Sequence, residues 1–187
     1  MKIYSPVSKP LIRQGFGKEN TNASVMHIYQ SLGLLGHDGW DFMVNCKDSQ
    51  VKHGGQCQPI YYSMDGYGTI SYIQKDDAHG WGINAIDEDG IHKYCWWHFD
   101  IINPDLKVGD RIEGGDYLGG AGNTGYSTGA HLHFGLYEYG LEDNGYKGAI
   151  DPTPFYVPIF VNDFIDGLKA QISIIKKILE VIKSLLK

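Results

Sequence analysis

Short apolar runs broken by glycine recur along most of the chain, and the clearest of them alternates apolar and polar positions from His131 to Leu136. Side chains two residues apart on a β-strand share a face. A strand here would send Leu132 and Phe134 into a core and place His131 and His133 together on the other face. Taken alone, such a histidine pair is more often a surface feature than a metal site.

A second stretch, from His37 to Val44, shows the same alternation. Read as a strand, it has one apolar face that includes Trp40 and Phe42, and another face that carries His37 and Asp41. A carboxylate and an imidazole are costly to bury unpaired, and a shared metal ion would satisfy both. An exposed strand edge with two polar side chains is the equally open alternative.

An aromatic run that begins at Tyr94 contains a further candidate, His98. Strand parity puts His98 on the same face as Tyr94 and Trp96, and a lone histidine in such a run is more often a packed core residue than a catalyst. The glycine-rich residues 120–129 form a loop that leads to His131. They lack the Gly-Lys-Ser/Thr ending of a phosphate-binding loop and precede a strand rather than a helix.

Turn residues divide the middle of the chain. Pro59 to Ile73 predicts two strands joined by a turn, residues 45–58 read as an irregular insertion, and residues 75–89 read as a polar segment punctuated by glycine. There are 25 glycines and 7 prolines among 187 residues, which agrees with many turns between short strands. The sequence therefore predicts a mainly β protein with a compact antiparallel β-sheet or sandwich domain.

The pattern changes after residue 158, where apolar positions recur every three or four residues and predict an amphipathic helix over residues 159–187. The chain thus divides into a β domain at 1–158 and this helix. Its heptad seam consists of Ile165, Leu168, Ile172, Ile175, Leu179, Ile182 and Leu186. Further apolar residues widen the stripe beyond this seam: Phe164, Ile174, Ile178, Val181 and Leu185.

Three partners would cover so apolar a face: the chain's own β domain, a membrane surface, or another helix. We favour a homo-oligomer or a helical partner through residues 161–187, because the seam runs for three heptads and the β domain is complete by Val157. The whole chain is then expected to be oligomeric, and a truncation to residues 1–160 to be a folded monomer.

Composition narrows the classes of partner. A formal net charge of −6 argues against nucleic acid, and no run of 18 apolar residues forms a transmembrane segment. The first residues carry no apolar signal core, so the sequence leaves the export route open.

Cys46 and Cys57 are either bridged or free thiols, and Cys95 lies in an apolar run. The remaining histidines match no ligand spacing and are assigned to loops or the surface: His27, His53, His79 and His92.

Taken in order, these motifs resemble the lysostaphin-type zinc metalloendopeptidases of bacterial cell-wall lysis. The resemblance covers about residues 10 to 156 and rests on Gly-Phe-Gly, His37-x-Gly-x-Asp41, the aromatic run ending in His98, Val-Gly-Asp, Gly-Asn-Thr-Gly, Thr-Gly-Ala-His131-Leu-His133-Phe and a trailing Asp-Pro. The chain departs from the family in a longer, cysteine-bearing segment after Val44. It also has Asp-Glu-Asp where family members often carry a histidine before the aromatic run.

The resemblance implies a zinc-dependent endopeptidase with a groove that binds a peptide of bacterial peptidoglycan. Because the first residues show no export signal, a phage-type lysin or virion-associated wall hydrolase is favoured over a secreted enzyme. It implies one Zn²⁺ per chain held by His37, Asp41 and His133, with His98 and His131 as the catalytic residues and either of them as the base. The activity would lie at the cell wall, whether extracellular, periplasmic or virion-associated. Two alternatives stay open: a peptidoglycan-binding or regulatory module of the same fold that has lost catalysis, and a phosphocarrier-like β domain with paired histidines.

Overall fold

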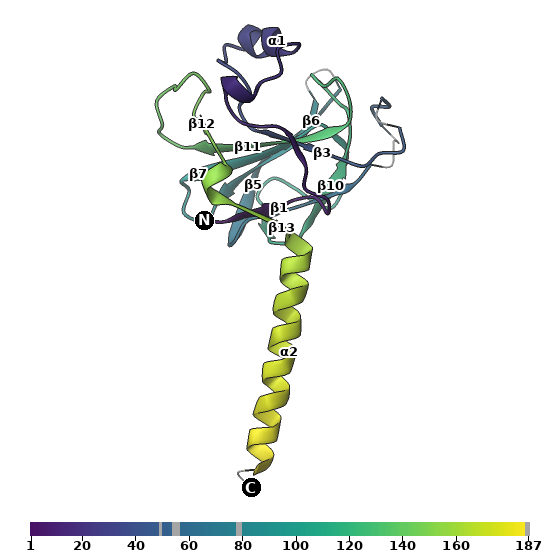
Figure 1. Cartoon of the computed structure of the whole chain (residues 1–187), viewed down its shortest axis with the longest axis vertical. Helices are drawn as coiled ribbons and strands as arrows, with labels where there is room; N and C mark the ends of the chain where they lie inside the picture. Colours follow the sequence, from purple (N-terminus) through teal and green to yellow (C-terminus); the bar gives the residue numbers. More distant parts are fainter. Residues whose placement is uncertain (49, 54–56, 78–79, 186–187) are drawn as a thin grey trace.

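The computed structural model describes residues 1–48, 50–53, 57–77 and 80–185, and in it one long helix projects from a β domain (Figure 1). His79, assigned above to a loop or the surface, lies outside the described residues. In chain order the described elements are β1 (Ile3–Ser5), β2 (Ile12–Gln14), η1 (Lys18–Asn20), α1 (Met26–Ser31), β3 (Trp40–Met43), β4 (Pro59–Tyr61), β5 (Tyr67–Asp76), β6 (Gly80–Asp87), β7 (His92–Trp97), β8 (Phe99–Ile102), β9 (Arg111–Glu113), β10 (Tyr117–Ala121), β11 (His131–Glu138), β12 (Ala149–Ile150), η2 (Thr153–Phe155), β13 (Tyr156–Phe160) and α2 (Val161–Leu185).

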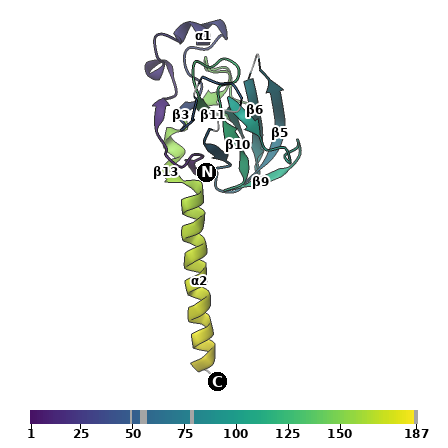
Figure 2. The ribbon, with the colours of Figure 1, turned by 90° about the vertical axis from the view of Figure 1, so that its right-hand side faces the viewer.

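The described strands form a large antiparallel sheet and two smaller ones. The large sheet has the order β2-β3-β11-β7-β6-β5-β9, with β12 paired to β11. A second, antiparallel sheet has the order β4-β10-β8, and β1 pairs with β13 in parallel. Figure 2 shows β10 of the second sheet beside β5 and β6 of the large one. The predicted fold class, mainly β and antiparallel with one amphipathic helix after it, is confirmed.

One hydrophobic core joins the two antiparallel sheets. Trp96 of β7, Phe134 of β11 and Phe42 of β3 come from the large sheet and are fully buried, as is Phe99 of β8 in the second sheet. Burying each such side chain stabilises the fold by about 2–3 kcal/mol. A register slip of one residue would turn these side chains to solvent, so the core also fixes the register that positions the site.

Two described elements differ from the sequence prediction. Within residues 75–89, read as a polar segment, residues 75–76 instead end β5 and residues 80–87 form β6, in which Ile83 and Ala85 are fully buried. The strand was not predicted because its glycines were read as turn residues. Gly82 instead lies inside the strand and leaves room for the ring of Trp97, where a Cβ would clash. The short helix α1 was not predicted, because no side chain caps its start and the usual sequence signal is therefore missing.

Residues 45–58 follow the predicted irregular course where they are described. Cys46 and Cys57 are joined by a disulfide, so the question of free thiols is answered for this pair. Cys95 is a free thiol and is buried.

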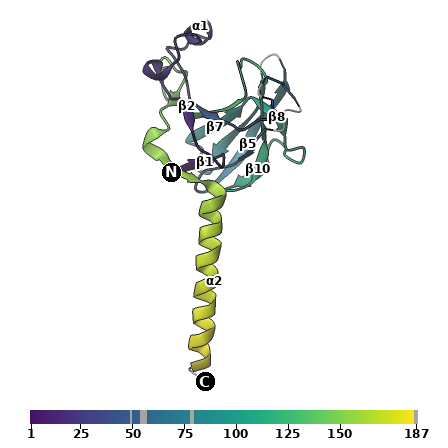
Figure 3. The same ribbon diagram turned by 45° about the vertical axis from the view of Figure 1, so that its right-hand side comes forward.

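The helix α2 begins at Val161, directly after β13 has paired with β1 in the β domain. Val161 is buried, and Phe164 stacks on Tyr4 with ring centroids 4.5 Å apart. Beyond these first turns every described residue from 166 to 183 is exposed, and Figure 3 shows the helix pointing away from the domain. The alternative in which the whole apolar face docks onto the chain's own domain is therefore not the one observed.

The division into units at residue 158 falls within β13 and stays a prediction, as does self-association. Leu186, the last residue of the predicted seam, lies outside the described residues. In the described part of the chain, no helix combines the length and the apolar character needed to cross a membrane.

Candidate metal centre and active site

The candidate site lies where β3 and β11 run side by side. In their antiparallel register Asp41 pairs with His133. The predicted alternation of β11 is confirmed by burial, because Leu132 and Phe134 are fully buried on the core side. His131 and His133 therefore share the opposite face, on which the side chain of Asp41 also lies.

His37 comes from the segment before β3, since that strand starts only at Trp40. A backbone bridge to Gly17 holds His37 in place, and its backbone N–H donates to Oγ1 of Thr21 at 2.7 Å. A Cβ on Gly39 would lie 2.9 Å from the ring of His133, closer than real Cβ atoms come. The glycine of the His-x-Gly-x-Asp motif thus allows the histidine of β11 to approach.

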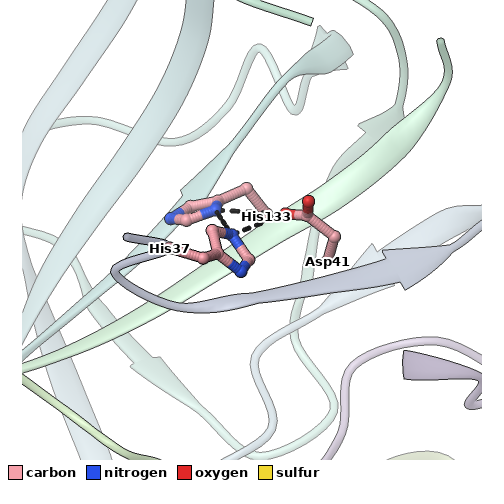
Figure 4. A group of neighbouring side chains, drawn as sticks. All are labelled: His37, Asp41 and His133. Atoms are coloured by element: carbon pink, nitrogen blue, oxygen red, sulfur yellow. Dashed lines mark hydrogen bonds and ion pairs between the residues drawn. The ribbon is translucent and has the colours of Figure 1, made fainter. Parts of the chain in front are cut away.

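Three donor atoms converge in this site (Figure 4). Nε2 of His37 lies 3.1 Å from Oδ1 of Asp41 and 3.0 Å from Nδ1 of His133, and this Nδ1 lies 3.2 Å from the same Oδ1. Donors about 2.0–2.2 Å from one tetrahedral zinc ion lie about 3.3–3.5 Å apart. The triangle therefore fits a single metal ion with little adjustment.

Neighbouring groups orient the two histidines of the triangle. Nδ1–H of His37 donates to the carbonyl oxygen of Gly15 at 2.9 Å, which leaves the lone pair of Nε2 available to a metal. Nε2 of His133 lies 3.8 Å from Oδ1 of Asp38. The hydroxyl of Tyr137 in turn donates to Oδ2 of Asp38 at 2.8 Å. Such outer contacts fix ring orientation and ligand basicity, so these residues fit a metal ion with an open fourth position.

His131 and His98 lie beside the triangle and are held by backbone carbonyl groups. Nδ1–H of His131 donates to the carbonyl oxygen of Gly129 at 2.8 Å, and its Nε2 lies 3.5 Å from Oδ1 of Asp41. Nδ1–H of His98 donates to the carbonyl oxygen of Thr124 at 2.7 Å. The two rings lie 4.5 Å apart between centroids, and each keeps Nε2 as its unprotonated nitrogen.

The strand-parity prediction is wrong for His98. Its backbone φ of 71° lies in the left-handed region, which residues other than glycine seldom adopt, and falls between β7 and β8. This break turns the ring away from the core face of Tyr94 and Trp96 and brings it to His131. Local strain of this kind is concentrated at functional sites.

Burial and hydrogen bonding set the protonation of the site. Burial alone would raise the pKa of Asp41, but the imidazoles of His133 and His37 beside its carboxylate outweigh burial and hold that pKa well below its usual range. Burial, together with the nearby His131 and His133, lowers the pKa of His98 to about 3. Burial also lowers the pKa of His131. At neutral pH the site therefore contains an ionised carboxylate beside two neutral imidazoles that can accept a proton.

A groove of about 850 Å³ opens over the site, and several of its walls were not singled out from the sequence. Tyr29 of α1 lines it, and the amide of Gln14 donates to the Tyr29 hydroxyl at 2.9 Å while lying 3.5 Å from Oδ2 of Asp41. Gln50 of the disulfide-closed loop and Tyr126 of the glycine-rich loop also line the groove. These residues are far apart in the sequence and only the fold brings them together, so no motif spacing identifies them.

Comparison with protein families gives a match to the sequence model described as Peptidase family M23, over residues 36–152. This range contains all five candidate residues. Glycyl-glycine endopeptidase ALE-1 of Staphylococcus capitis is 40% identical over 73 residues, which are 39% of this chain and 19% of that protein. Lysostaphin of Staphylococcus simulans is 32% identical over 126 residues, 66% of this chain and 22% of that protein. The chain thus spans about a fifth of the length of these relatives.

Solved structures show the same likeness in fold. The antimicrobial peptidase lysostaphin from Staphylococcus simulans superimposes with a TM-score of 0.57 at 26% identity, over 83% of this chain and 54% of that one. A zinc-containing peptidase from Vibrio cholerae gives a TM-score of 0.57 at 22% identity, over 81% of this chain and 39% of that one.

Proposed function

Because the chain belongs to peptidase family M23, we propose that it is a zinc metalloendopeptidase that hydrolyses peptide cross-links or stem peptides of bacterial peptidoglycan. The observation that carries the proposal is the triangle of His37, Asp41 and His133, in which both histidines are buried and Asp41 is partly buried, with edges of 3.0–3.2 Å. Two nitrogens and one carboxylate oxygen form the ligand set of catalytic zinc sites, which keep one position open. The glycyl-glycine endopeptidase among the relatives supports a peptide as substrate.

The chain's own residues supply the proton transfers. Zinc held by the triangle would polarise the scissile carbonyl and let water ionise near pH ~7. His131 and His98 are neutral, and each has its Nδ1–H bound to a carbonyl oxygen, so each presents Nε2 as an acceptor. One of them takes the proton of the attacking water. That histidine then becomes a donor, which can stabilise the oxyanion and protonate the leaving amine.

The groove suits an extended peptide with small side chains. Gly129 lies directly in its wall, and glycine lets a peptide backbone approach the protein backbone closely. A catalytically inactive binding module of the same fold is the alternative, but none of the five candidate positions carries a substitution that would remove a ligand or a base. Action at the cell wall and the role of a phage-type lysin stay predictions.

We expect the purified chain to release new amino groups from isolated bacterial cell walls and to lower their turbidity. A chelator should stop both, and added Zn²⁺ should restore them, because the triangle provides the only proposed route to an activated water. The measurement is amine release and turbidity on walls from several bacteria. Binding to walls without amine release at any metal concentration would instead support the inactive module.

The contact from Tyr137 to Asp38 gives a separate test of the metal site. Replacing Tyr137 by phenylalanine removes the hydroxyl that holds Asp38 beside His133, and loss of such an outer contact typically weakens metal affinity about 10–100-fold. Zinc affinity is measured by competition with a chromophoric chelator. Tyr139→Phe serves as the control because Tyr139 is exposed. Equal affinity in both variants would show that Asp38 does not orient His133.

A further inference from the structure

The helix α2 differs in charge from the domain that carries it. Residues 161–187 contain five lysines and three acidic residues, so their net charge is +2, whereas residues 1–160 hold the remaining −8 of the total of −6. Four of the five lysines lie in the described part of the helix that projects from the domain: Lys169, Lys176, Lys177 and Lys183. The projecting part is therefore basic on an otherwise acidic protein.

The exposed apolar face of α2 is wider than a coiled-coil seam. The side chains that form it are between 42% and 58% exposed: Leu168, Ile172, Ile174, Ile175, Ile178, Leu179, Val181 and Ile182. At 100° per residue the apolar positions of the whole helix cover an arc of about 200°. A pair of coiled helices buries only the a and d positions. Ile174 and Val181 lie at c positions, outside the seam, and would stay in water.

Three lysines border this apolar arc, and in a coiled coil of two α2 helices no carboxylate would lie opposite them. Lys169, Lys176 and Lys183 each follow a d-position residue and so occupy the e positions along one edge. In a parallel pair they would face the g positions, which hold Phe164, Gln171 and Ile178 and no acid. In an antiparallel pair the lysines would face one another. Self-association along the seam therefore lacks charge complementarity.

We propose that α2 lies along the surface of an anionic lipid bilayer, with its apolar arc among the acyl chains and its lysines at the lipid phosphates. A wide apolar face bordered by lysines is the pattern of an interfacial helix, because long lysine side chains bury their methylenes and place their charge at the headgroups. The ion pairs Lys169–Asp166 and Lys183–Glu180 are exposed and lie within the helix, so they leave the apolar arc open.

The fold gives this placement a direction. The helix leaves the β domain at β13, whereas α1, which lines the groove over the metal site, lies at the opposite end of the domain (Figures 1–3). With α2 flat on a bilayer, the groove would therefore be displaced along the membrane plane, at the end of the domain farthest from the helix.

The test is sedimentation of the full chain with vesicles of equal parts phosphatidylglycerol and phosphatidylcholine, and with vesicles of phosphatidylcholine alone. We expect binding to the anionic vesicles to be at least about tenfold tighter. Ile175→Gln with Leu179→Gln should weaken it by about tenfold or more, because two apolar side chains leave the acyl region. Ser173→Gln with Ala170→Gln is the matched control on the polar face and should bind like the parent. Lys176→Gln with Lys183→Gln should remove most of the preference for anionic lipid.

Three results would overturn the proposal. The first is no binding to anionic vesicles; a dimer or larger assembly by light scattering, dissociated by Ile175→Gln with Leu179→Gln, would then assign the face to a second copy. The second is equal binding to both lipid mixtures. The third is equal loss in the apolar variant and its matched control. Zinc content and peptidase activity of each variant are measured separately, so failure of the lipid test leaves the proposed function standing.

Discussion

Replacement of Asp41 by alanine is expected to abolish both metal binding and turnover. Asp41 supplies the one anionic donor of the triangle, and its carboxylate is within 3.1–3.2 Å of both histidine donors. Without it two neutral imidazoles remain, and the positive ion loses its charge compensation in a buried site. We expect zinc content to fall from about one ion per chain to near zero, and the rate of peptide hydrolysis to fall by about 10³-fold or more.

His133→Ala should have the same effect, because His133 contributes the donor from the neighbouring strand. Metal content by atomic emission and the rate on isolated walls are the two measurements. Asp105→Ala is the control, since Asp105 is an exposed carboxylate in a loop away from the triangle. Retention of about one zinc per chain by both Asp41→Ala and His133→Ala would show that the metal is held elsewhere.

His131→Ala and His98→Ala are expected to keep the metal and to lose turnover. Neither side chain belongs to the donor triangle, and each presents Nε2 as an acceptor beside it. Removal of a general base or of an oxyanion donor typically costs about 10²-fold or more in rate. The loss should appear in kcat rather than in zinc content, because the role proposed for these residues is to act on water and the oxyanion.

The controls separate this role from a structural one. His27→Ala changes an exposed histidine and should leave both zinc content and kcat as in the parent. Thermal unfolding of each variant reports whether the β domain is intact. If His131→Ala loses zinc as completely as His133→Ala, then His131 is a ligand and the assignment of roles is wrong. If His98→Ala keeps its full rate, His98 takes no part in the chemistry.

Strand alternation predicted the part of the site that lies on regular strands. Leu132 and Phe134 are buried as expected, and this places His131 and His133 on one face. The same rule failed at His98, because a left-handed residue between β7 and β8 breaks the alternation. Such a break leaves no trace in the sequence when the residue is not glycine. The family resemblance, which relies on motif order rather than on parity, did include His98.

Long-range packing explains what the sequence did not predict. Tyr29 and Gln14 reach the groove only because α1 and β2 fold over the metal site, and residues 15 positions apart have no local pattern that joins them. The same holds for Asp38, whose role depends on a hydroxyl 99 residues away. The helix α2 was predicted because its periodicity is local, whereas its projection from the domain was not, because periodicity does not say which surface an apolar face meets.

The most direct measurement is a zinc titration of the chelator-stripped chain while peptide hydrolysis on isolated walls is followed. We expect no hydrolysis without metal and a rate that rises linearly with added Zn²⁺ and saturates at about one ion per chain. Stripped protein with the full rate, or metal-loaded protein with no hydrolysis on any wall while one zinc is bound, would contradict it.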